Sequence, residues 1–134
     1  FFFKQKTAYE IVSRDWSSDV CSSDLAQFEW YAHAPQALRA GVAPEIVNAI
    51  RDKRRPVFAK PEEEAIYDYG VELFRNHAIS DKSYNRAKEI FGIPAIVELS
   101  CLMGYYGMVA MTLLSHQMPL QANAVILQGK VKAP

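Results

Sequence analysis

The sequence predicts an all-α fold. Apolar residues recur at helical spacing over most of residues 28–118, no stretch of any length alternates polar and apolar residues as a strand does, and prolines and glycines stand where helices begin and end. The 134-residue chain is neutral, with 15 Lys and Arg against 15 Asp and Glu. Neutrality argues against a nucleic-acid-binding surface, so we expect no nucleic-acid partner.

Residues 1–25 differ from the rest of the chain. They lack the apolar run of a secretory signal, and Ser17-Ser18-Asp19 and Ser22-Ser23-Asp24 form a short repeat. The segment resembles the translated read-through of a sequencing adapter, and we expect it to be non-native, disordered and outside the fold. We therefore predict three parts: this segment, a helical domain over 26–120, and a C-terminal tail over 121–134.

The first helix is predicted to begin near Phe28 and to end at Gly41, which can adopt the left-handed conformation of a C-terminal cap. Its apolar positions are Phe28, Tyr31, Ala32 and Leu38. Pro35 lies inside this helix and cannot donate a hydrogen bond to the carbonyl of Tyr31, so a kink is expected there.

A proline introduces each of the next two helices. Pro44 suits the first turn of a short helix, whose apolar stripe is Ile46, Val47 and Ile50. Pro61 precedes three glutamates that favour the positive end of a helix dipole, and this third helix is expected to run to about Ile79. Its predicted core stripe is Ile66, Tyr69, Gly70, Leu73, Phe74 and His77.

A fourth helix is predicted to begin after Ser80, a good N-cap residue, and to end at Gly92. Its inward positions are expected to be Tyr84, Ala87, Ile90 and Phe91. The last helix is predicted to begin near Pro94 and to end before Pro119.

The last helix is unusually apolar, because no charged residue occurs from Leu99 to Gly129. Polar residues interrupt it and no Lys or Arg anchors it closely, so we expect no membrane span. A helix of this kind needs cover on all sides, which predicts a homo-oligomer. Cys101, the only cysteine after residue 25, is expected to be a buried, inert thiol, and a lone cysteine fits a cytoplasmic protein.

Glu29 and His33 are the candidate catalytic residues. Their four-residue spacing places a carboxylate and an imidazole one turn apart on one face of the first helix. An ordinary surface ion pair has the same spacing, but the neighbouring aromatic side chains favour partial burial. Trp30 and Tyr31 are the candidate substrate-binding residues. No metal site is expected, since this pair offers two ligands where three or more are usual.

The stretch Phe28-Glu29-Trp30-Tyr31-Ala32-His33-Ala34-Pro35, with Ala37-Leu38-Arg39-Ala40-Gly41-Val42 after it, resembles the signature helix of the carboxymuconolactone decarboxylase family. That family shares its all-helical fold with the AhpD-like alkylhydroperoxidases. Ile96-Val97-Glu98-Leu99 and Gly104-Tyr105-Tyr106-Gly107-Met108-Val109-Ala110 are similar to the closing helix of the family. The resemblance spans Gln27 to about Leu120.

This resemblance implies a lyase of aromatic compound catabolism that removes carbon dioxide from a lactone carboxylic acid, with His33 as general acid and Glu29 as its partner. It implies no metal or organic cofactor, and a homotrimer or hexamer. Family members have helices before the signature helix, where residues 1–25 stand here, so we expect an N-terminally truncated fragment of the AhpD-like fold that closes on a long apolar helix.

Two alternatives stay open. The first is an AhpD-like alkylhydroperoxidase or peroxiredoxin-type relative. It is disfavoured because redox members carry Cys-x-x-Cys ahead of the histidine, and the corresponding positions here are Ala26 and Glu29. The second is a non-catalytic helical oligomerisation module. Release of carbon dioxide from a lactone acid would support the decarboxylase, and thiol-dependent peroxide turnover would support the alkylhydroperoxidase relative. Neither activity, with intact assembly, would support the oligomerisation module.

Overall fold

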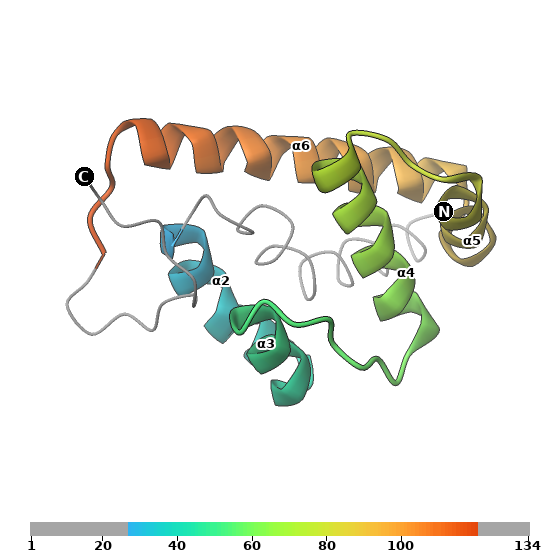
Figure 1. The fold of residues 1–134 in the computed structure, drawn as a ribbon, viewed down its shortest axis with the longest axis horizontal. Helices are drawn as coiled ribbons and strands as arrows, with labels where there is room; N and C mark the ends of the chain where they lie inside the picture. The colour runs from blue at the N-terminus through green and yellow to red at the C-terminus, as the bar shows by residue number, and fades with distance from the viewer. Residues whose placement is uncertain (1–26, 121–134) are drawn as a thin grey trace.

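The computed structural model describes residues 27–120, and within this range every regular element is a helix, which confirms the all-α class. The predictions for residues 1–26 and for the tail 121–134 lie outside the described residues. Figure 1 shows α6 along one edge of the molecule, with α2 near one of its ends, α4 and α5 toward the other, and α3 farther from α6, next to α2. The helices are α2 (Gln27–Arg39), α3 (Pro44–Arg51), α4 (Pro61–Val71), the π-helix η1 (Glu72–Asn76), α5 (Asp81–Phe91) and α6 (Ile93–Ser115).

Helix α2 ends in the cap that Gly41 predicts. Gly41 has a φ of 91°, its N–H donates to the carbonyl of Leu38 at 3.1 Å, and the N–H of Val42 donates to the carbonyl of Ala37 at 3.1 Å. This pair of bonds is a Schellman motif, which satisfies the last carbonyls of the helix and turns the chain toward α3. The helix continues through Pro35.

The first core cluster joins α2 to α3. It contains Trp30, Ala34, Ala37, Val42, Ile46, Val47 and Ile50. The apolar stripe predicted for the short second helix is confirmed. That of α2 is wrong, because none of its four predicted positions is buried, and Phe28, Tyr31 and Ala32 are only half-buried. Leu38 is exposed, because the buried face is centred on Trp30, Ala34 and Ala37, and Leu38 lies at its edge near the helix end.

The third predicted helix is two elements. Helix α4 stops at Val71, a π-turn follows, and His77 ends it in the left-handed conformation with a φ of 51°. Ile66 and Tyr69 are buried as predicted, and Leu73 and Phe74 pack against the same cluster. His77 is exposed, contrary to prediction, because the wider π-turn rotates the residues after it away from the core face.

Helix α5 begins and ends as predicted. The Ser80 hydroxyl accepts from the N–H of Ser83 at 3.2 Å, and Gly92 follows the last residue with a φ of 81°. The prediction that Tyr84 and Ile90 point inward is wrong, because both are exposed. The helix packs through a narrow stripe of small residues, Ser83 and Ala87, which leaves larger side chains at its flanks.

Helix α6 completes a second core cluster with α4 and α5. Its buried members are Ile66, Tyr69, Ala87, Ile96, Leu99 and Met103. Cys101 is exposed rather than buried, because it lies on the opposite side of the helix from Leu99 and Met103. By length and composition α6 is able to cross a membrane, and 22% of its most apolar 18-residue stretch is buried inside the molecule.

Candidate functional site

Glu29 and His33 lie side by side on α2. Their four-residue separation within one continuous helix brings Nδ1 of His33 to 2.9 Å from Oε2 of Glu29. Glu29 is 2% exposed, and its acid group is therefore shielded from solvent. The two atoms are within ion-pair distance, but they are not aligned as a hydrogen bond, and neither has another hydrogen-bond partner in the described part of the chain.

The burial of this pair is asymmetric. The side chain of His33 keeps 19% exposure whereas that of Glu29 keeps 3%. Since Nδ1 is itself buried, the exposed part of the imidazole lies elsewhere on the ring. Nδ1 faces Glu29, so Nε2 is the ring nitrogen that does not face the acid group. A carboxylate in such a place has to be compensated by its neighbour, because an unpaired buried charge is costly.

Tyr106 adds a residue from α6 to this pair. Its ring meets the imidazole of His33 edge to face, with centroids 5.2 Å apart and an interplanar angle of 87°. Tyr105 lies next to Tyr106 with centroids 5.4 Å apart. The sequence-based predictions contain this tyrosine pair only as part of the stretch similar to the closing helix of the family, and they do not connect it to His33. The sequence feature that could have identified Tyr106 as a site residue is the pair of adjacent tyrosines between two glycines in a mainly aliphatic helix.

The two predicted substrate-binding residues lie in different surroundings. Trp30 is 2% exposed and fills the first core cluster, which gives it a packing role. Tyr31 is half-buried, and its ring lies 6.3 Å from that of Phe28. Contact of either residue with a substrate stays a prediction.

The remaining histidines do not join the pair. His77 is exposed at the end of η1, and His116 caps α6, where its Nδ1 lies 2.9 Å from the carbonyl of Thr112. Within residues 27–120 no group of three or more His, Cys, Asp or Glu side chains is arranged to hold a metal ion. The expectation of a metal-free site stays a prediction.

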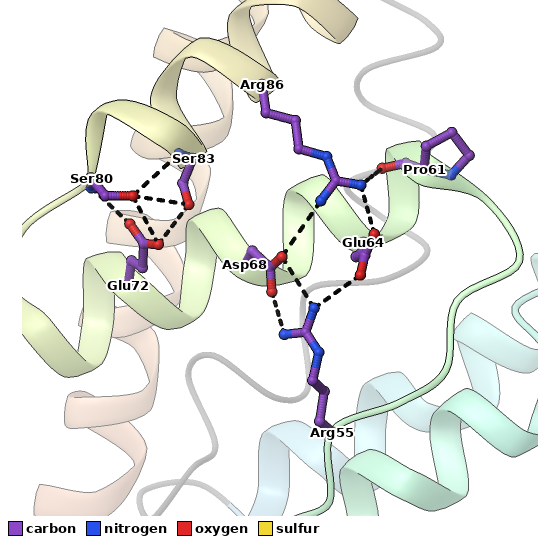
Figure 2. Close-up of polar contacts among 8 residues, drawn as sticks. All are labelled: Arg55, Pro61, Glu64, Asp68, Glu72, Ser80, Ser83 and Arg86. Carbon is purple, nitrogen blue, oxygen red and sulfur yellow. Dashed lines mark hydrogen bonds and ion pairs between the residues drawn. The ribbon is translucent and has the colours of Figure 1, made fainter.

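A second group of charges lies where α4 meets α5, and Figure 2 shows its contacts. Arg55, in the loop before α4, contacts Asp68 through both guanidinium nitrogens and Glu64 at 3.1 Å. Arg86 of α5 reaches Glu64 at 2.6 Å and the carbonyl of Pro61 at 3.4 Å. The two arginines, Arg86 first, hold the pKa of the Glu64 carboxyl below its usual value. Sequence reasoning missed this group, because its members are far apart in the chain.

Glu72 forms a third polar contact, at the start of α5 (Figure 2). Its carboxylate accepts from the Ser83 hydroxyl at 2.6 Å and from the Ser80 N–H at 2.7 Å. These two donors, Ser83 first, lower the pKa of Glu72. The contact ties η1 to the N-cap of α5, and its role is structural.

No protein-family model, no curated protein and no solved structure matches this chain. The resemblance to the carboxymuconolactone decarboxylase family therefore rests on the residues quoted from the sequence.

Proposed function

We propose that this chain is a carboxymuconolactone decarboxylase-like enzyme of the AhpD-like fold, with His33 as general acid and Glu29 as its partner. The observation that carries the proposal is the asymmetric pair. A buried carboxylate faces Nδ1 of an imidazole that is itself partly exposed, with 2.9 Å between the two atoms. Such a pair combines a group that can transfer a proton with a group that fixes its orientation and charge.

The reaction would proceed by cleavage of one carbon–carbon bond. The bond between the carboxylate carbon and the lactone carbon that carries it breaks, and carbon dioxide leaves. The electron pair of that bond stays on the lactone carbon and is delocalised into the lactone. The protonated imidazole of His33 donates its Nε2 proton to that carbon, and solvent then reprotonates the ring. Glu29 would stabilise the imidazolium before transfer and hold Nδ1 toward itself, so that Nε2 faces the substrate.

The remaining parts of the proposal follow from the resemblance. They are a lactone carboxylic acid as substrate, no cofactor, a cytoplasmic location, and assembly as a homotrimer or hexamer. A non-catalytic helical module is the second candidate, and the exposed apolar face of α6 favours it, because such a face serves assembly rather than chemistry.

The test is the rate of carbon dioxide release from an unsaturated lactone carboxylic acid. His33→Gln should reduce that rate by about 10²–10⁴-fold, the usual contribution of a positioned general acid. Glu29→Gln should reduce the rate less than His33→Gln does, because the amide of glutamine still orients the imidazole ring. The double variant should be little slower than His33→Gln alone, since two groups acting as a unit are not additive.

The matched control is His77→Gln, an exposed histidine outside the pair, which should leave the rate unchanged. All variants must keep the wild-type helical circular dichroism signal and unfolding midpoint. Wild-type turnover by His33→Gln would make the pair a structural bridge, and absence of any carbon dioxide release from the wild type with intact assembly would favour the non-catalytic module.

A further inference from the structure

An exposed seam runs along the outer face of α6. It consists of six positions spaced alternately by four and three residues, all of them exposed. Its members within the helix are Val97, Cys101, Gly104, Met108, Met111 and Ser115. This average spacing of 3.5 residues is the heptad repeat with which one helix packs along another.

The seam is apolar and uncharged. Met108 is 57% exposed and Met111 is 63% exposed, although methionine normally lies inside proteins. Beside them is an open groove of about 610 Å³, lined by Phe74 together with seam residues such as Gly104 and Met111. A ridge of flexible side chains next to a recess suits a partner helix that carries both features itself.

We propose that the seam binds a second copy of α6, antiparallel, about a two-fold axis at Met108. This inference specifies the interface of the homo-oligomer proposed above, and it does not depend on the catalytic role of His33. A two-fold contact fits a dimer or a hexamer and excludes a simple trimer.

Side-chain size selects the antiparallel direction. With Met108 opposite itself, Gly104 of one copy faces Met111 of the other, and Cys101 faces Ser115. The large Met111 side chain then lies over the space left by Gly104, and Cys101 and Ser115 are both small enough to lie against each other. In a parallel pair each residue would face its own copy, so Gly104 would face glycine and leave a gap, which costs packing energy.

Electrostatics favours the same direction. The seam has no charged side chain, so two copies do not repel each other there. Adjacent antiparallel helices place the positive end of one dipole beside the negative end of the other. No other charge complementarity is needed to align the pair.

The size of the contact sets the expected strength. Helix α6 has 23 residues and is about 34 Å long, so an end-to-end strip about 10 Å wide is available on each copy. This footprint is below that of a standard stable interface, about 800 Å² per partner. We therefore expect association in the micromolar range.

Disulfide trapping of the full chain tests both the contact and its direction. In the antiparallel pair two copies of position 108 meet at the two-fold axis. Two copies of position 101 are about 21 Å apart along the helix direction, beyond disulfide reach. The chain with Cys21→Ser, Cys101→Ser and Met108→Cys should give a covalent dimer on mild oxidation. The chain with Cys21→Ser alone, which keeps Cys101, should not, and adding Ser115→Cys to it should restore the dimer.

Association measured by sedimentation gives an independent readout. Met108→Glu puts two like charges at the axis and should abolish the dimer at about 100 µM protein, a concentration chosen for micromolar association. Val57→Glu, an equal change at an exposed apolar residue in the loop before α4, should leave it intact. Circular dichroism confirms that both variants fold.

Three results would overturn the proposal. A covalent dimer through Cys101 alone would show a parallel pair. A monodisperse wild-type monomer at about 100 µM would show that no copy binds at the expected affinity. Flotation with phosphatidylcholine vesicles, without trapping at position 108 in aqueous buffer, would assign the seam to a membrane.

Discussion

Two regions of the molecule set carboxylates against basic side chains, and they differ in burial and in hydrogen bonding. Between α4 and α5, Glu64 and Asp68 share two arginines near the surface. On α2, the buried Glu29 has His33 as its one partner among residues 27–120, at 2.9 Å and without hydrogen-bond alignment. Exposed ion pairs replace contacts with water and contribute little, whereas a buried carboxylate depends on its single neighbour. Loss of one partner should therefore lower the free energy of unfolding only slightly in the first region and strongly in the second.

The largest effect on stability is expected from His33→Ala. Removing the imidazole takes away the one partner that the described residues give the buried acid group of Glu29. The free energy of unfolding at pH 7 should fall by up to about 3–5 kcal/mol, the loss found when a buried pair is broken. Denaturant unfolding measures this loss.

His33→Gln is the control for that loss, because its amide can still donate to Glu29. It should be clearly more stable than His33→Ala, and Glu29→Gln combined with His33→Ala should recover part of the loss. A cost for His33→Ala below about 1 kcal/mol, the scale of an exposed pair, would remove the contrast between the two regions.

Helix ends were predictable because their signals are local. Gly41, Pro44, Ser80 and Gly92 mark boundaries in the sequence, and each occupies the cap or first-turn position expected of it. The four-residue spacing of Glu29 and His33 likewise predicted that the two side chains are in contact, since this contact depends only on α2 being helical.

The sequence predictions that failed concern features set by contacts between residues far apart in the chain. The π-turn at Glu72–Asn76 has no signal in the apolar spacing, and it displaced His77 from the core. The exposed side chain of Cys101 and the buried side chain of Ser83 follow from which face of each helix meets α4, and apolar content alone does not specify that face. The contact of Tyr106 with His33 joins α2 to α6 and required the fold itself.

A smaller effect on stability is expected in the exposed network of ion pairs formed by Arg55, Glu64, Asp68 and Arg86. Arg86→Met removes the contact with Glu64 at 2.6 Å, but Arg55 still pairs with Glu64 and Asp68, so the loss should be about 0.2–1 kcal/mol. Near 1 M salt the difference from wild type should shrink further, because salt screens exposed charges.

Arg75→Met, at an exposed arginine of η1, is the matched control and should change stability less. A loss for Arg86→Met as large as that for His33→Ala would mean that the network, despite its exposure, is as dependent on single partners as the buried pair.

The smallest effect concerns Glu72 and depends on pH. The hydroxyl of Ser83 and the N–H of Ser80 hold the pKa of this carboxyl below its reference value of 4.5. The charged form is therefore the one that folding favours, and its contribution to stability is complete above pH 4.5 and is lost as the pH falls through the lowered folded-state pKa. Glu72→Gln keeps an oxygen that accepts these hydrogen bonds and removes only the charge.

We accordingly expect the thermal midpoint of Glu72→Gln to lie a few degrees below wild type at pH 7, on the scale of about 4–8 °C per kcal/mol for a domain of this size. The gap should narrow as the pH falls below 4.5. Glu64 and Asp52 also have lowered pKa values, but both variants retain them, so their contribution cancels in the comparison. A gap that persists unchanged at low pH would show that the shape of the Glu72 side chain, and not its charge, holds the start of α5.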